Sequence, residues 1–314
     1  MLKCGRGSAY GCFFSRRRYK EIIESWFDMT GKRRIIIFLV LLVIVLLSAV
    51  LIYEDKNLEI NTYEISSLDL PEEFNGFRIA HISDLHNAEF RKGNEKLISM
   101  LRDTSPDIIA ITGDIIDSRR TDVDISFEFV QQALEIAPCY YVTGNHEARV
   151  TDEYAVLKEK MAQVGVIILE NDSISLECEG TFIEILGLED PTFAVSGTAD
   201  MEAEAVAREL GQLATGDDKF TLLLSHRPEF FDVYAENDID LVLSGHAHGG
   251  QFVLPFVGGF IAPGQGFFPE YDSGLFRKDG TTMFVSRGIG NSIIPLRINN
   301  RPEIILIELH SEDK

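Results

Sequence analysis

Hydrophobic positions follow two different periods from residue 77 onward. Short runs of β-branched and other apolar residues predict buried strands, and apolar residues spaced by three and four positions around 97–101 and 127–134 predict helices between the early strands. The predicted strands cover residues 77–83, 107–112, 139–143, 166–169, 174–178, 182–188, 220–225, 239–244, 282–286 and 303–309. Nearly continuous apolar strands that alternate with helices indicate an α/β domain whose sheets are covered on both faces.

One apolar segment near the start of the chain is too long for a strand. Residues 35–53 read IIIFLVLLVIVLLSAVLIY, 19 positions without a charge. As a helix they would extend about 28 Å, enough to cross the hydrocarbon core of a bilayer. The segment is longer than the apolar part of a signal peptide, and no small-x-small cleavage site follows it. The pattern predicts an uncleaved, single-pass transmembrane helix.

Charge is distributed unevenly on the two sides of this segment. Residues 1–34 contain nine basic and three acidic residues, a net charge of +6, which leaves −27 for the rest of the chain out of a total of −21. The positive-inside rule places this basic tail in the cytoplasm and the domain outside it, at the cell membrane. The run SRRRYK at 15–20 resembles a twin-arginine export signal, but a simple basic flank is favoured because 14 residues separate it from the apolar segment. An acidic domain argues against nucleic acid as a partner.

Beyond the apolar segment, the chain divides into a connecting stretch and one domain. Residues 54–74 are polar and mixed, and 58–66 (LEINTYEIS) is a candidate edge strand. Residues 75–314 contain no internal repeat or low-complexity tract and are predicted to form a single domain. Cys139 and Cys178 lie in its strand-like segments, where a buried free thiol is the default and a disulfide is the alternative.

Polar residues gather directly after five of the predicted strands. They are Asp84 and His86 after the first strand, Asp114 after the second, Asn145, His146 and Glu147 after the third, His226 after the seventh, and His246 and His248 after the eighth. Ligands of open α/β sheets bind beyond the carboxyl ends of the strands, so these side chains are expected to converge.

The residue types in this set indicate a metal centre. Carboxylates, imidazoles and an amide oxygen suit divalent cations, and the lack of thiolates in the set disfavours a structural zinc site. The candidate ligands are Asp84, His86, Asp114, Asn145, His226, His246 and His248. Seven ligands are too many for one ion and fit two ions that share a carboxylate. Asp84 and His86 are two positions apart, so an extended chain would direct both to one side, and the neighbouring glycines allow a close approach of the backbone.

Five short motifs, taken together, resemble one enzyme family. They are D-x-H at 84–86, G-D at 113–114, G-N-H-E at 144–147, a lone histidine at 226 and G-H-x-H at 245–248. In this order they look like the calcineurin-like metallophosphoesterases, and the resemblance covers roughly residues 75–310. Further similarity at 245–263 and 286–309 points to the membrane-associated bacterial branch, phosphodiesterases near the inner membrane, some with lipid-linked substrates. The resemblance implies a four-layer α/β/β/α sandwich of two mixed sheets, preceded by the N-terminal transmembrane helix.

The resemblance also implies a role for each candidate. By motif position, Asp84, His86 and His248 would hold a first metal ion, Asn145, His226 and His246 a second, and Asp114 would bridge both. His146 would lie beside the scissile group, oriented by Glu147. We expect it to stabilise the transition state or to protonate the leaving oxygen, a task that a protonated imidazole suits near pH 7. A hydroxide shared by the ions would attack phosphorus. His146, Glu147 and Asp114 are thus the expected catalytic residues.

These features predict a metal-dependent phosphoesterase. It would hydrolyse a phosphodiester or diphosphate bond of a membrane-proximal or lipid-linked substrate. A soluble nucleotide or phosphomonoester is the alternative substrate, and a non-catalytic metal-binding scaffold is the alternative function. The ligand set accepts Mn, Fe, Co, Ni or Zn.

Several further features are left with two interpretations. Arg287 would bind a substrate phosphate or else stabilise the structure near the ligands. Residues 117–120 would form the rim of the site or a solvated loop, and 258–276 would be a substrate loop that dips toward lipid or a plain connector. His81 is predicted to be a packed core histidine.

Overall fold

The computed structural model describes residues 30–213, 219–291 and 296–312, and the predicted basic tail lies outside them up to residue 29. The chain separates into two compact units, 1–51 and 52–314. Helix α2 begins at Gly31 and ends at Lys56. Among the described residues, no helix combines the length and hydropathy that a membrane span requires, so the transmembrane helix predicted at 35–53 is not supported. The side chains at 47, 49–52 and 55 lie outside the described residues.

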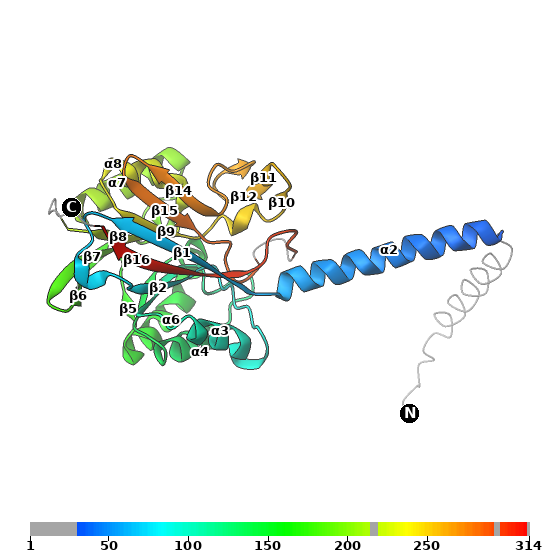
Figure 1. The fold of residues 1–314 in the computed structure, drawn as a ribbon, viewed down its shortest axis with the longest axis horizontal. Coiled ribbons are helices and arrows are strands. Elements are labelled where there is room, and N and C mark those ends of the chain that lie inside the picture. Colours follow the sequence, from blue (N-terminus) through cyan, green and yellow to red (C-terminus); the bar gives the residue numbers. More distant parts are fainter. Residues whose placement is uncertain (1–29, 214–218, 292–295, 313–314) are drawn as a thin grey trace, which may run out of the picture. The chain divides into compact units, whose positions relative to one another are not determined.

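Two mixed sheets of six strands form the centre of the second unit (Figure 1). The strand order is β1-β16-β2-β3-β4-β5 in the first sheet and β14-β15-β9-β8-β7-β6 in the second. The strands are β1 Glu59–Ser67, β2 Arg78–Ile82, β3 Ile108–Thr112, β4 Cys139–Val142, β5 Ile167–Ile168, β6 Asp172–Cys178, β7 Thr181–Gly187, β8 Thr221–Leu224, β9 Leu241–Ser244, β14 Gly274–Lys278, β15 Thr281–Val285 and β16 Glu303–Ser311. All ten predicted strands and the edge strand are confirmed, with bounds within two residues of those expected.

Helices cover the outer faces of both sheets. They are α3 Glu95–Asp103, α4 Val123–Leu134, α5 Asn145–Arg149, α6 Thr151–Val164, α7 Ala199–Leu213 and α8 Phe231–Glu236, with short 3₁₀ turns at Glu72–Phe74, Lys92–Asn94, Pro191–Phe193, Pro228–Phe230 and His248–Gly250. Helices α3, α4 and α6 lie on the first sheet, and α7 and α8 lie on the second (Figure 1).

Three groups of buried apolar side chains separate these four layers. Leu97 and Phe129 pack between helices and the first sheet, Ile79 and Leu222 between the sheets, and Tyr234 between the second sheet and its helices. Each such side chain contributes about 1.5–3 kcal/mol through burial. The α/β sandwich of two mixed sheets is therefore confirmed.

Strand direction places the functional loops together. Strands β2, β3 and β4 are parallel, as are β7, β8 and β9, so each set ends at one edge of its sheet. We call this edge the carboxyl edge. Strand β16 is antiparallel to β2 and parallel to β1, so Glu59 and Glu303, where β1 and β16 begin, also lie there. The chain therefore enters the second unit at the carboxyl edge.

Residues 251–267 form two small hairpins that follow β9. Strand β10 Val253–Leu254 pairs with β11 Gly258–Gly259, and β12 Ile261–Ala262 pairs with β13 Gly266–Phe267. The sequence showed no strands here, because ladders of two residues carry no recognisable period. The segment 258–276 thus contains the short strands β11, β12 and β13.

Candidate metal centre

Six of the seven expected ligands meet at the carboxyl edge in two groups. Asp84, His86 and His248 offer ligand atoms within 4.8 Å of one another, and Asp114, His226 and His246 do the same. All six side chains are buried. They come from the loops after β2, β3, β8 and β9, which is the convergence that their positions at strand ends predicted.

Asp114 connects the two groups. Its Oδ2 atom lies 3.3 Å from His226 Nε2 and 3.7 Å from His86 Nε2, so one carboxylate oxygen faces a histidine of each group. His146 joins Asp114 and His86 in a third group of possible ligands. A carboxylate in this position has the geometry of a ligand shared between two cations.

The donor atoms fit divalent cations. In the first group, His248 Nε2 lies 3.1 Å from His86 Nε2 and 3.2 Å from Asp84 Oδ1. In the second group, His226 Nε2 lies 3.1 Å from His246 Nδ1. Imidazole nitrogens and carboxylate oxygens that point at one another in a buried site match the preferences of borderline metals such as Mn, Fe, Co, Ni and Zn. The residues present therefore fit two ions.

Left-handed backbone presents most of these ligands. Positive φ angles occur at Asp84 (54°), His86 (47°), Asp114 (51°), His246 (65°) and His248 (49°). Such conformations cost non-glycine residues roughly 1–3 kcal/mol each and cluster at functional sites. The sequence argument that Asp84 and His86 share one face of an extended chain is wrong, because tight turns rather than a strand bring them together.

Two glycines allow the ligand loops to approach each other. A Cβ atom on Gly144 would lie 2.3 Å from Asp114 Oδ1, and one on Gly245 would lie 1.9 Å from Ser83 Oγ and 2.4 Å from Asp84 Oδ2. Any side chain at either position would displace a ligand carboxylate or its neighbour. The close backbone approach expected from the glycines is confirmed at both positions.

Asn145, the seventh expected ligand, lies next to the second group. With its amide oriented to satisfy its neighbours, Asn145 donates to His246 Nδ1 over 2.9 Å and accepts from the Arg149 guanidinium over 2.8 Å. In the opposite orientation of the same amide, the Asn145 oxygen faces His246, where a cation of the second group would lie. The sequence analysis did not single out Arg149.

Glu147 contacts backbone amides rather than the His146 ring. Its carboxylate accepts hydrogen bonds from the backbone N–H groups of Gly144 (2.8 Å), Asp114 (2.9 Å) and Ile116 (3.2 Å). Burial and the nearby Asp114 carboxylate raise the pKa of Glu147 to about 7. This side chain therefore fixes the loop after β3 to the loop after β4, a different task from the one that the resemblance implied.

His146 lies at the edge of the cluster as a neutral ring. Ser118 N–H donates to its Nδ1 over 3.0 Å, which leaves the Nε2 atom to carry the proton, and Nε2 lies 3.9 Å from Asp114 Oδ2. Burial lowers the pKa of His146 to about 4, against the opposing effect of Asp114. At neutral pH the free enzyme thus has a neutral Nε2–H donor here and not the protonated imidazole expected from the sequence.

Burial keeps two of the four expected histidine ligands neutral. Burial lowers the pKa of His248 to about 3 and holds the pKa of His246 well below its usual value, so both rings are neutral and free to ligate. At His226 burial acts in the same direction, but the Asp114 carboxylate outweighs it and raises the pKa to about 10. A cation that binds His226 must displace that proton, because only the neutral ring is a ligand.

A buried arginine that the sequence analysis did not identify supports the second group. Arg227 Nε lies 2.7 Å from Asp190 Oδ2, and its NH1 lies 3.1 Å from Glu229 Oε1 and 3.5 Å from His246 Nε2. Its place directly after His226 is the only signal that the sequence offers. The two carboxylates compensate the buried guanidinium beside the ring.

The remaining candidates have structural partners. Arg287 NH1 lies 2.7 Å from Glu59 Oε1, and the Arg287 backbone N–H donates to Glu303 Oε1 over 2.9 Å. Asp117 is buried, accepts from Arg119, and lies 3.6 Å from His146 Nδ1, so this part of the 117–120 loop belongs to the site. His81 is buried with Nε2 2.8 Å from Thr112 Oγ1, as expected of a core histidine.

The two cysteines of the domain do not pair. Cys139 is buried and Cys178 is half-buried, and both are free thiols. Cys178 Sγ contacts the carbonyl oxygen of Glu73. The alternative of a disulfide between them is therefore excluded.

The part of the chain that carries these clustered residues matches a known protein family. Residues 77–250, which contain every expected metal ligand, match the family described as calcineurin-like phosphoesterase. The chain belongs to the calcineurin-like phosphoesterase family. The resemblance read from the five motifs is confirmed, and with it the class of metal-dependent phosphohydrolases whose centre holds two metals.

Three relatives of this phosphoesterase come from different organisms. The chain is 31% identical over 271 residues to YkuE of Bacillus subtilis, an uncharacterized metallophosphoesterase, and the aligned region covers 82% of this chain and 87% of the relative. It is 28% identical over 244 residues to the phosphodiesterase YaeI of Escherichia coli, covering 74% and 82%. It is 29% identical over 268 residues to a Bos taurus transmembrane protein with a metallophosphoesterase domain, covering 80% and 57%.

Proposed function

We propose that this phosphoesterase uses two metal ions to hydrolyse a phosphodiester or diphosphate bond of a membrane-proximal or lipid-linked substrate. The observation that carries the proposal is the position of Asp114, whose carboxylate faces histidines of both ligand groups. The first group would hold one cation, and the second group, with Asn145, would hold the other. Asp114 would be the shared ligand.

The chemistry divides between the ions and the surrounding residues. Two divalent cations held there would activate water at neutral pH and neutralise the oxygens of the phosphoryl group. Glu147 keeps the loops of Asp114 and Asn145 in register. His146 presents its Nε2–H toward Asp114, where it can donate to a phosphoryl oxygen or to the leaving oxygen as charge develops on it.

The point where the chain enters the domain supports a membrane-proximal substrate. Only residues 54–58 lie between the apolar segment and β1, which begins at the carboxyl edge. Glu54 is tied to that edge by Arg301, whose NH2 lies 2.8 Å from Glu54 Oε1. Five residues reach at most about 18 Å. If residues 35–53 lie in a membrane, the start of β1 at the carboxyl edge would lie within this length of chain from it.

The two small hairpins offer a surface suited to lipid. Phe256, Val257, Phe267 and Phe268 are each more than half exposed. The hairpins contact the metal loop, since Phe260 N–H donates to the Gly250 carbonyl over 3.0 Å. Exposed phenylalanines insert at the boundary of headgroups and acyl chains, so this surface would seat the centre at a bilayer.

Names of the relatives agree with both parts of the proposal. The Escherichia coli relative is named a phosphodiesterase, and the Bos taurus relative is named a transmembrane protein. Transferred to this chain, those descriptions favour a diester substrate and a membrane location. The basic N-terminal tail would then place the N-terminus in the cytoplasm and the domain on the other side.

A substrate panel tests the proposal. The full chain in neutral detergent, loaded in turn with Mn, Fe, Co, Ni or Zn, would be assayed on an aryl phosphodiester, an aryl phosphomonoester, a nucleotide and a lipid-linked diphosphate. We expect turnover of the diester or lipid diphosphate to be highest. Higher turnover of the nucleotide or the monoester would replace the substrate assignment. Absence of turnover on every substrate, with two ions bound, would reject the enzymatic function. Release of the full chain from membranes by alkaline carbonate would reject the anchor.

A further inference from the structure

A second charged site adjoins the metal centre at the carboxyl edge. A cavity of about 500 Å³ opens between Lys56, the turn that carries Glu89 and Arg91, the first turn of α3 with Lys96, and Gly290 in the loop after β15. Its volume lies within the range of small-molecule sites, roughly 300–1,000 Å³. The cavity shares no lining residue with the two ligand groups.

The cavity is basic in a strongly acidic domain. Lys56, Arg91 and Lys96 line it against one carboxylate, Glu89, whose Oε1 accepts from Gly93 N–H over 3.2 Å. Within the described residues, no ion pair joins any of these three cations to a carboxylate within 4.0 Å. Lys96 Nζ instead donates to the Lys56 carbonyl over 3.4 Å, which places the Lys96 ammonium beside the backbone of Lys56.

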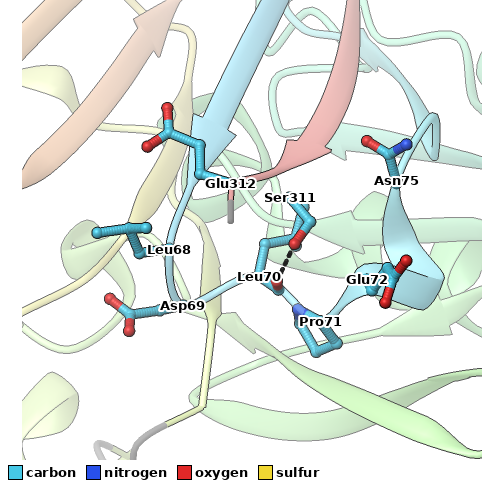
Figure 2. Close-up of a pocket in the computed structure, with 8 residues that line it drawn as sticks. All are labelled: Leu68, Asp69, Leu70, Pro71, Glu72, Asn75, Ser311 and Glu312. Atoms are coloured by element: carbon cyan, nitrogen blue, oxygen red, sulfur yellow. Dashed lines mark hydrogen bonds between the residues drawn. The ribbon is translucent and has the colours of Figure 1, made fainter. Parts of the chain in front are cut away.

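The opposite edge of the same sheet provides a contrast. A cavity of about 450 Å³ lies where β1 and β16 end, and Figure 2 shows the carboxylates of Asp69, Glu72 and Glu312 around it. The Ser311 hydroxyl donates to the Leu70 carbonyl there over 3.0 Å. Two cavities of similar size thus have opposite charge, and the basic one is next to the metal ligands.

The walls of the basic cavity are fixed to a ligand loop. Gly290 N–H donates to the Asp84 carbonyl over 2.7 Å, and Ile289 N–H donates to the Ser83 carbonyl over 3.0 Å. Ala88 N–H donates to the Leu85 carbonyl over 2.8 Å. A ligand in the cavity would therefore sit directly behind the turn that carries Asp84 and His86.

We propose that this cavity binds an anionic, phosphate-bearing group of the substrate that is not cleaved. Cations grouped in a concave site without carboxylate partners are stabilised by an anion, and Arg91 can contact two oxygens of a phosphate at once. The inference rests on the proposed hydrolysis at the metal centre. It adds that the enzyme selects substrates with a second anionic group, such as a phospholipid headgroup or a soluble organic phosphate.

Lysine footprinting tests binding without requiring catalysis. The full, metal-loaded chain in neutral detergent would be acetylated briefly, and modification of Lys56, Lys96 and Lys92 would be quantified by mass spectrometry. Lys92 is exposed and does not line the cavity, so it reports general changes in reactivity. The probes are inorganic phosphate, glycerol phosphate, and mixed micelles of phosphatidylglycerol or phosphatidylcholine.

Each outcome decides the inference. Protection of Lys56 and Lys96 relative to Lys92 by the soluble phosphates supports the site and assigns it to soluble ligands. Protection by phosphatidylglycerol alone supports it and assigns it to a lipid headgroup. No selective protection by any probe overturns it, as does equal protection of all three lysines.

Kinetics of charge variants test the role in substrate choice. Two aryl phosphodiesters would be compared that differ only in a second phosphate on the alkyl arm. The double variant Arg91→Gln/Lys96→Gln should lower the preference for the doubly anionic substrate about tenfold, and Lys92→Gln should leave the preference unchanged. An unchanged preference in the double variant overturns the inference. Lack of turnover on both substrates would instead count against the proposed function, and the footprint would still decide the site.

Discussion

Replacing Glu147 with glutamine separates two explanations of this buried carboxylate. In the structure, Oε2 accepts hydrogen bonds from Gly144 N–H and Asp114 N–H, and Oε1 accepts one from Ile116 N–H. Glutamine keeps one oxygen and replaces the other with an amino group that can only donate. In either orientation of the amide, at least one backbone N–H faces a donor.

The size of the effect follows from these contacts. A hydrogen bond to a charged group contributes about 1.5–3 kcal/mol, and a buried N–H left without a partner costs about 1–3 kcal/mol. The variant gains something in return, because burial of the carboxylate is itself unfavourable and raises the pKa of Glu147 to about 7. We therefore expect Glu147→Gln to lower the free energy of unfolding by about 2–4 kcal/mol at pH 8.

The same variant should lose metal, because the amides that Glu147 holds belong to the loops of Asp114 and Asn145. Weakened support of metal ligands typically lowers affinity by about 10–100-fold. Urea unfolding with and without a chelator would measure stability, and mass spectrometry of bound metal would measure occupancy. Glu153→Gln on the exposed face of α6 is the matched control, with an expected change within about 0.5 kcal/mol.

One result would refute the reasoning. If Glu147→Gln kept its stability and both metals but lost turnover to the same extent as His146→Ala, the carboxylate would act through the histidine ring. That is the role that the resemblance implied from the sequence. Loss of stability and metal together would assign Glu147 to the connection between the two loops.

Three further variants have distinct expected results. Asp114→Asn should lose metal and turnover together, and metal analysis that still finds two ions would contradict a shared carboxylate. His146→Ala should keep both metals while turnover falls about 10²–10⁴-fold, more for poor leaving groups than for good ones, and near-wild-type turnover of a poor leaving group would contradict its role as a donor. Burial lowers the pKa of His81 to about 3, so the unfolded chain takes up a proton between about pH 6.5 and 3 that the folded chain does not, and stability falls as the pH falls through that window. His81→Gln should flatten this part of the chelated protein's curve of unfolding free energy against pH, and an unchanged slope in urea unfolding at pH 7 and pH 5 would contradict the assignment.

The strands were predictable because their residues carry the signal themselves. Buried runs such as 107–112 and 220–225 are apolar at four of their six positions, which is typical of a strand covered on both faces. Helix α7 was not predicted, because only Ala205, Val206 and Leu210 are buried in its fifteen residues. The insertion of β16 between β1 and β2 depends on pairing between residues more than 200 positions apart, such as Glu59 with Glu303, which no local pattern encodes.

The ligands were predictable for a related reason, but the residues that hold the ligands in place were not. A ligand such as His248 or Asp114 is identified by its own side chain and by its place after a strand. Glu147 is defined by three backbone amides, and Arg227 is held by the nearby Glu229 and by Asp190, 37 residues away in the sequence. Most of these partners are therefore not displayed by the sequence. The resemblance assigned Glu147 to the nearest side chain, which is the assumption that the structure does not bear out.

Backbone conformation at the ligands explains why the extended-chain argument failed for Asp84 and His86. Five left-handed ligands cost about 5–15 kcal/mol together, comparable with the whole net stability of a domain. The loops offset this by bonding to each other: Asp84 N–H donates to the Gly113 carbonyl over 3.0 Å and His86 N–H to the Asp114 carbonyl over 3.0 Å. The turn after β3 therefore stabilises the turn after β2, and the Glu147 carboxylate stabilises the turn after β3. A conformation sustained by such contacts between loops follows from the assembled fold, so no local pattern in the sequence displays it.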